Sequence, residues 1–162
     1  MDKSKMKRET ANDPFALREM GKKHYLEGTY ETAVEYWTKA AELGDVEAHY
    51  HLSILYRKGE GVDKDEKKRM HHLEEAAIGG HPSARHNLAC EEWNKDRIDR
   101  GVKHFIIATN LGYDYSLQEL KDCYARGLVS KEDFAAALRA HQTAVDATKS
   151  PQREEAAEAA RK

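Results

Sequence analysis

Three glycines close near-identical phrases along the chain, and this repetition limits the possible folds more than any other feature. The phrases span residues 40–44, 76–80 and 108–112, and their final glycines lie 36 and 32 residues apart. Glycine adopts at little cost the left-handed conformation that ends many helices. Self-similarity at such a period is the mark of proteins built from stacked supersecondary units. The sequence therefore predicts an array of helical repeats.

A second phrase begins shortly after each closing glycine. The two complete copies are Ala48, Leu52, Tyr56 and Gly59, and Ser116, Leu120, Tyr124 and Gly127. The copy between them keeps Ala84 and Leu88 but has Trp93 one place beyond the expected aromatic. A weaker copy precedes them at Leu17, Gly21, Tyr25 and Gly28. Spacings of four place these residues on one face of a helix. Stripes of the same kind precede the glycines: Val34, Trp37 and Ala41; Met70, Leu73 and Ala77; and Val102, Phe105 and Thr109. Each repeat is thus predicted to be two amphipathic helices, A and B.

The pattern predicts helices at about residues 14–27, 30–43, 46–58, 64–79, 82–94, 97–111, 114–126 and 131–147. Asp45 suits the N-cap of one helix, Pro82 the first turn of another, and Ser130 the cap of the last. Because a lone pair of helices cannot bury its apolar face, the pairs must stack on one another. We expect an all-α fold, a right-handed α/α superhelical solenoid of about four helix-pair repeats.

The array is predicted to occupy residues 14–147. Residues 1–13 are expected to form a flexible N-terminal segment, and residues 148–162 a C-terminal tail. The tail contains the cap-like pair Ser150-Pro151, so it suits a short helix capping the last repeat, and its composition equally suits a disordered end. The sequence leaves these two interpretations open.

Charge and composition narrow the class of partner. The 27 basic and 29 acidic residues are mixed along the chain and give a formal net charge of −2, so no basic face is expected to follow a nucleic acid backbone. No stretch approaches the roughly 20 apolar residues of a membrane-spanning helix. Cys90 and Cys123 are the only cysteines, and without a secretion signal they read as reduced thiols. We expect a cytoplasmic or nuclear protein with a protein partner.

The phrase Ala-x-x-x-Leu-x-x-x-Tyr-x-x-Gly-x-Gly-Val, closed by Ala-Ala-x-x-Gly, resembles the Sel-1-like repeat, and it is most complete from Ala48 to Gly80. The resemblance implies an α/α solenoid related to tetratricopeptide repeats and an adaptor that assembles protein complexes. Asn12-Asp13-Pro14 also resembles the lead into the array in proteins that carry a RING domain, but this chain has no cysteine-rich RING segment. The third repeat departs from the pattern by lacking the glycine pair and the aromatic, and the fourth by lacking the Ala-Ala closure.

The tetratricopeptide-like frame predicts which A-helix residues face the concave side. The predicted partner-binding residues are Tyr50, Ile54, Arg57, His86, Cys90, Trp93, Gln118, Asp122 and Arg126. Tyrosine, tryptophan and arginine are enriched in binding hot spots. Trp93 has an equally weighted alternative, in which it replaces the missing repeat aromatic and packs between helices. Loss of stability on its mutation would indicate packing, and loss of binding alone would indicate the groove.

Catalytic chemistry and metal binding are less favoured. His49 and His51 are two residues apart and project to different sides of a helix. His72 and His104 each stand eight residues before a closing glycine, as expected for a ladder of partly buried rings, and no third ligand recurs for zinc. Nothing around Cys90 or Cys123 marks a nucleophile. We therefore predict no catalytic residue, metal or cofactor.

The predicted function is a non-enzymatic protein-interaction adaptor that binds a peptide or helix on the concave face of the A helices. Two alternatives remain open from the sequence. One is a hydrolase with a Cys/His or metal site on the solenoid. The other is a regulatory segment of a ubiquitin-ligase-type assembly.

Overall fold

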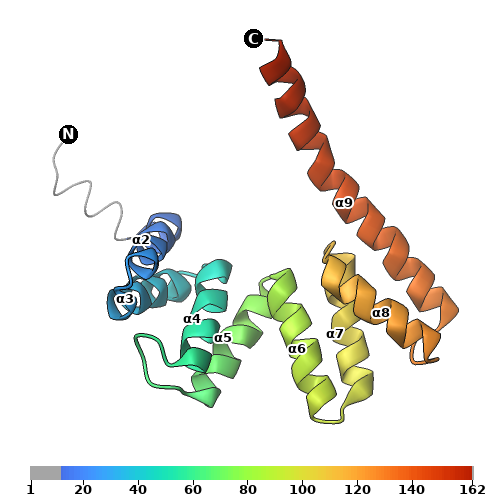
Figure 1. Cartoon of the computed structure of the whole chain (residues 1–162), viewed down its shortest axis with the longest axis horizontal. Helices are drawn as coiled ribbons and strands as arrows, with labels where there is room; N and C mark the ends of the chain where they lie inside the picture. The colour runs from blue at the N-terminus through green and yellow to red at the C-terminus, as the bar shows by residue number, and fades with distance from the viewer. Residues whose placement is uncertain (1–11, 162) are drawn as a thin grey trace. The chain divides into compact units, whose positions relative to one another are not determined.

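The computed structural model describes residues 12–161, and within them the secondary structure is α-helix joined by short turns. Residues 1–11, which make up most of the predicted N-terminal segment, lie outside the described part. The helices are α2 (Pro14–Leu26), α3 (Tyr30–Glu42), α4 (Val46–Lys58), α5 (Glu66–Ile78), α6 (Pro82–Asn94), α7 (Ile98–Asn110), α8 (Asp114–Ala125) and α9 (Lys131–Ala160) (Figure 1). Seven of the predicted ranges agree with these bounds to within two residues at either end.

The helix ends follow local chemistry. The Asp45 carboxylate accepts a hydrogen bond from the Ala48 backbone N–H at 2.8 Å, and the Ser130 hydroxyl accepts one from Asp133 at 3.1 Å, which confirms both predicted caps. The closing glycines Gly44, Gly80 and Gly112 have φ of 88°, 90° and 89° respectively, the left-handed conformation that the repeat pattern required.

The last helix is longer than predicted. Instead of ending near residue 147, α9 continues to Ala160 and includes Pro151. The Ser150-Pro151 pair therefore begins no separate capping helix, and the described tail residues are helical. Pro151 has no N–H to donate, so the helix loses one backbone hydrogen bond there without ending. Figure 1 shows α9 running well past the end of α8.

Contacts divide the chain into two compact units, Met1–Ala84 and Arg85–Lys162. In unit 1, α2 packs on α3, α3 on α4, and α4 on α5. Its core contains Leu17, Ala33, Val34, Trp37, Ala40, Ala41, Ala48, Leu52 and Leu55. Six of these core residues belong to the predicted stripes, namely Leu17, Val34, Trp37, Ala41, Ala48 and Leu52.

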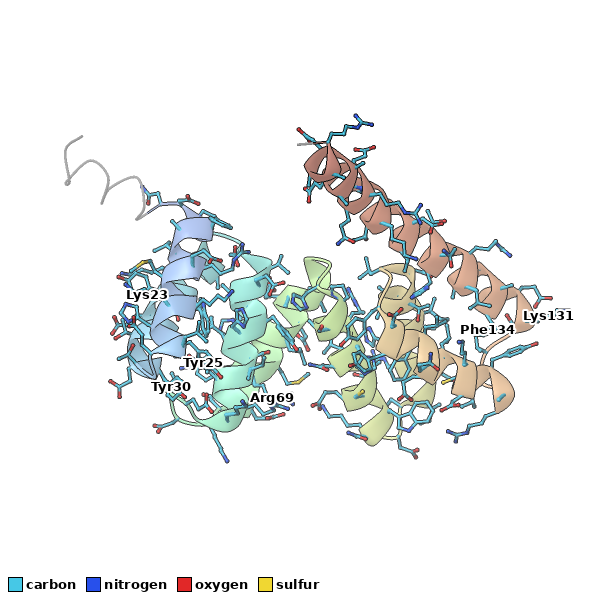
Figure 2. All side chains as sticks on the ribbon, turned by 45° about the horizontal axis from the view of Figure 1, so that its top comes forward. Lys23, Tyr25, Tyr30, Arg69, Lys131 and Phe134 are labelled. Carbon is cyan, nitrogen blue, oxygen red and sulfur yellow. The ribbon has the colours of Figure 1, made fainter. Side chains whose placement is uncertain are left out.

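The longer A–B connection of unit 1 also contributes to the packing. It runs from Gly59 to Asp65, and Val62 packs against the core. Gly61 has φ +71°, and its Cα lies so close to α3 that a Cβ atom would stand 2.5 Å from the Tyr30 carbonyl carbon. Tyr30 in turn lies beside Tyr25, with ring centroids 5.2 Å apart, at the α2–α3 turn (Figure 2). The extra residues therefore tie the second repeat to the first.

In unit 2, α7 packs on α8, and α9 packs on both. The core residues are Ala89, Val102, Phe105, Leu120, Cys123 and Ala137. Tyr124 of α8 stacks on Phe134 of α9 with centroids 4.5 Å apart, and Figure 2 labels Phe134 near the start of α9. The first turns of α9 thus cover the last repeat.

Thr109 stands where the first two repeats have Ala41 and Ala77, and its hydroxyl is buried without a hydrogen-bond partner among the described residues. A buried hydroxyl without a partner is costly, whereas an apolar group of the same shape is not. We expect Thr109→Val to raise the free energy of unfolding by about 1 kcal/mol. Urea denaturation against wild type measures the change, and a lower midpoint for the valine variant would contradict the prediction.

Candidate interaction surface

A cleft of about 650 Å³ opens in unit 1 between α2 and α4, with α3 beneath it. The α2 wall carries Arg18, Glu19, Lys22, Tyr25 and Leu26, the floor has Trp37, and the α4 wall carries Glu47, His51, Ile54 and Leu55. Spacings of three and four along each wall follow from the helical period, since such residues share one face. The cleft therefore lies between two consecutive A helices.

The floor of the cleft is held rigidly. Trp37 is 2% exposed, and its indole N–H donates a hydrogen bond of 3.0 Å to the Arg18 carbonyl. The His51 ring stacks on the indole with centroids 4.5 Å apart, and Tyr25 meets it at 5.6 Å. Gly21 of α2 is buried against this indole, and a Cβ atom there would approach it to 2.4 Å. The absence of a side chain at Gly21 thus lets the tryptophan sit between the walls.

Two charged groups at the rim are engaged with side chains outside the cleft lining. Arg18 pairs with Asp45 at 3.2 Å, and Glu47 pairs with His81 at 3.1 Å. Burial lowers the pKa of His51, opposed in part by the Glu47 carboxylate. The cleft thus combines an aromatic and aliphatic floor with charged edges, a composition that suits an apolar side chain flanked by polar groups.

The three predicted residues of unit 1 lie in three different surroundings. Ile54 lines the cleft. Tyr50 faces another neighbour, because its ring stacks on that of His81 with centroids 4.2 Å apart. Arg57 is exposed and is not among the cleft residues. The sequence analysis predicted no residue of the α2 wall. Tyr50 and Arg57 stand two and nine residues after Ala48, and the same offsets counted from Leu17 give Glu19 and Leu26, which both line the cleft.

The predicted residues of unit 2 also differ among themselves. His86 is half-buried, and its Nδ1 lies 2.7 Å from the Ser116 hydroxyl. Cys90 is half-buried against the core of unit 2, whereas Gln118, Asp122 and Arg126 are exposed on or just beyond α8. His86 and Cys90 are therefore engaged in packing, and the α8 residues are accessible.

Trp93 packs against the core on one side and contacts an arginine on the other. One part of the ring packs against the unit 2 core, with its centroid 6.3 Å from that of Phe105. The Arg126 guanidinium lies over the ring at 5.3 Å, a cation–π contact. The side chain is half-buried. Trp93 thus takes the packing position of the missing repeat aromatic, and the Arg126 side chain covers part of its ring.

A cluster of imidazoles that the sequence analysis did not anticipate joins α4 to α5. The Nδ1 atoms of His49 and His72 are 2.9 Å apart, which places one N–H against the lone pair of the other ring. His71 lies beside His72 with centroids 5.1 Å apart, and Tyr56 stacks flat on His72. Burial lowers the pKa of His72 from 6.5 to about 4, helped by His49, His71 and Lys68, and burial also lowers the pKa of His49 against the pull of Glu75.

These pKa shifts predict that unit 1 loses stability on mild acidification. The unfolded chain takes up protons near pH 6.5 while folded His72 does so only near 4, so the unfolded state binds more protons in between. The stability contribution is complete above about pH 6.5 and falls as the pH drops toward 4. We expect a lower melting temperature at pH 5 than at pH 7 in metal-free buffer, and a smaller difference for His72→Gln. An identical pH difference in both proteins would contradict this prediction.

The side chains suited to nucleophilic chemistry are poorly placed for it. Burial raises the pKa of the Cys90 thiol and of the Cys123 thiol, which disfavours the reactive thiolate at neutral pH. Ser116, the hydroxyl closest to His86, is 0% exposed, so a substrate cannot reach it. Cys90, Cys123 and the Ser116–His86 contact therefore contribute to packing between helices.

Residues 12–161 contain neither a cluster of three metal-binding side chains nor a helix able to span a membrane. No three His, Cys, Asp or Glu side chains among them converge in a way suited to a metal ion. None of the helices in this range combines the length and the apolar character needed to cross a membrane.

Comparisons with known proteins agree with the repeat pattern. Residues 14–45 and 46–81 each match the family model of the Sel1 repeat. The crystal structure of a Sel1 repeat protein from Oxalobacter formigenes matches with a TM-score of 0.66 and 23% sequence identity, over 82% of this chain and 59% of that chain.

A second solved structure, c5321, is a protective antigen present in uropathogenic Escherichia coli strains that displays an SLR fold. It matches with a TM-score of 0.65 and 26% identity, over 90% of this chain and 33% of that chain. The chain thus spans less than two thirds of both neighbours. No curated protein matches. Together the helices and these neighbours confirm the predicted class, an all-α solenoid of helix pairs.

Proposed function

We propose that this chain is a non-enzymatic adaptor whose partner docks in the cleft between α2 and α4, because residues 14–45 and 46–81 match the Sel1 repeat model. The repeat is generally a protein-interaction fold. The observation that carries the proposal is the cleft itself, because it lies between two A helices, where the groove was expected, and includes Ile54.

The composition of the cleft suggests the kind of ligand. Trp37 holds the floor in place, while Leu26, 74% exposed, and Ile54 present apolar surface at the two walls. Lys22 adds a positive charge on the α2 side and Glu47 a negative one on the α4 side. A peptide or helix that inserts one or two apolar side chains, with charges at either edge, fits such a surface.

Proximity labelling in cells, with wild type and variants compared, tests this proposal. A cleft variant, Leu26→Glu with Ile54→Glu, places two carboxylates on the apolar walls and is expected to lose the partners that wild type labels. Arg57→Glu is the matched control, because it adds negative charge on α4 without altering a cleft residue. Circular dichroism of both purified variants checks that they fold.

A partner lost from the cleft variant and kept by Arg57→Glu supports docking in the cleft. If the folded cleft variant keeps every partner, the proposed docking site is wrong. If Arg57→Glu and Trp93→Ala lose the partner instead, binding follows the original concave-face prediction of Tyr50, Arg57 and Trp93.

A further inference from the structure

One position of the repeat brings an A helix and a B helix together through polar side chains, and its occupants differ between repeats. In the second repeat these are His49, one residue after Ala48, and His72, eight residues before Gly80. In the third repeat the same places hold Arg85 and His104. His49 and His72 meet at 2.9 Å, and Arg85 Nη1 and His104 Nδ1 meet at 3.3 Å. The repeat architecture therefore places two side chains face to face at each site.

We propose that His49 and His72 form a two-imidazole binding site for a late first-row divalent metal ion, Cu²⁺ or Ni²⁺ in preference to Zn²⁺. Imidazole nitrogen is the donor that these ions share. The two Nδ1 atoms already face each other at 2.9 Å, so a rotation of both rings aims their lone pairs at one ion. A bound ion would lie to one side of the line between the two nitrogens once both rings turn toward it, with each ring carrying its proton on Nε2.

The separation of the two nitrogens selects among the ions. With metal–nitrogen distances of about 2.0–2.1 Å, nitrogens 2.9 Å apart subtend about 90° at the metal. That is the angle between adjacent ligands in tetragonal sites, the geometry of Cu²⁺ and Ni²⁺. Tetrahedral Zn²⁺ needs the nitrogens about 3.3 Å apart. The affinity order of divalent ions also places Cu²⁺ highest.

The surroundings are compatible with a partly hydrated ion. His49 and His72 are half-buried, so the site opens to solvent on one side. The Tyr56 ring stacks on His72 at 5.7 Å with an interplanar angle of 5° and covers one face of the imidazole. Since no third ligand among the described residues completes the set, water would fill the remaining positions. His71 and Glu75 lie nearby and add polar and negative character.

Isothermal titration of the purified full chain with Cu²⁺ alone and with Ni²⁺ alone tests the site. Wild type is expected to bind one equivalent, with Zn²⁺ weaker than either. His49→Arg gives the second repeat the Arg/His pair that the third repeat already has, so it should fold and lose affinity at least about tenfold. His104→Asn is the matched control, since it removes the equivalent histidine from the other unit, and it should bind as wild type does.

A gain-of-function variant makes the test independent of lost stability. Arg85→His places an imidazole opposite His104 in the third repeat, and we expect it to add a second equivalent of Ni²⁺ or Cu²⁺. Equal affinities for wild type and folded His49→Arg would overturn the proposal, because any binding would then be adventitious. A preference for Zn²⁺ over Cu²⁺ and Ni²⁺ would overturn the assignment of the ion. Neither result bears on partner docking in the cleft, which uses other residues.

Discussion

Replacing Leu52 with alanine is expected to lower the free energy of unfolding by about 2–5 kcal/mol. Leu52 is 0% exposed at the middle of α4, within the core of unit 1. Truncation removes apolar contacts and leaves a cavity that neighbouring helices cannot close without moving. Because a small domain has only about 5–15 kcal/mol in total, the loss is a large fraction of its stability.

Urea denaturation followed by circular dichroism measures this effect, and Leu43→Ala is the matched control. Leu43 lies in the same unit but is 47% exposed, so its truncation should change the stability by no more than about 0.5 kcal/mol. Comparable losses for the two variants would mean that the repeat positions do not form the core.

Replacing Gly61 with alanine is expected to lower the free energy of unfolding by about 2–5 kcal/mol, from two causes that add. A side chain at φ +71° costs about 1–2 kcal/mol in backbone conformation. The new Cβ would also lie 2.5 Å from the Tyr30 carbonyl carbon and 2.8 Å from the Glu31 nitrogen, so the loop must move off α3 at a further cost of about 1–3 kcal/mol.

Gly28→Ala separates these two causes. Gly28 has φ +79°, but a Cβ atom there meets nothing within 4 Å. Its substitution should therefore carry only the conformational cost of about 1–2 kcal/mol. If both variants lose the same amount by urea denaturation, the contact between the Gly59–Asp65 loop and α3 does not contribute to stability.

The repeated phrases predicted the helices well because the signals are local. Period-four apolar residues such as Ala48 and Leu52 define a buried face, and Asp45 and Gly44 mark where one helix begins and the preceding one has ended. The tail was the exception. Ser150-Pro151 has the composition of a helix start, yet it lies inside α9. A proline tolerated within a helix and a proline that opens one look alike in a sequence.

Which residues line the cleft depended on tertiary structure. Of the residues that the groove frame predicted on α4, Ile54 lines the cleft, whereas Tyr50 stacks on His81. Which side of an A helix faces its predecessor depends on how the pairs pack, and that packing involves contacts of large sequence separation. Arg18 and Lys22 joined the site only because α2 packs across α3 next to α4.

The sequence by itself thus determined the all-α repeat architecture, since hydrophobic period and caps act within one or two helical turns. Tertiary structure alone decided the pairing of His49 with His72, because it depends on the register between α4 and α5. His49 and His72 are four residues farther apart in the sequence than Arg85 and His104 are, and the longer loop of the second repeat contains the extra residues. No local signal carries that register, because it arises from two helices sliding until their apolar faces are both buried.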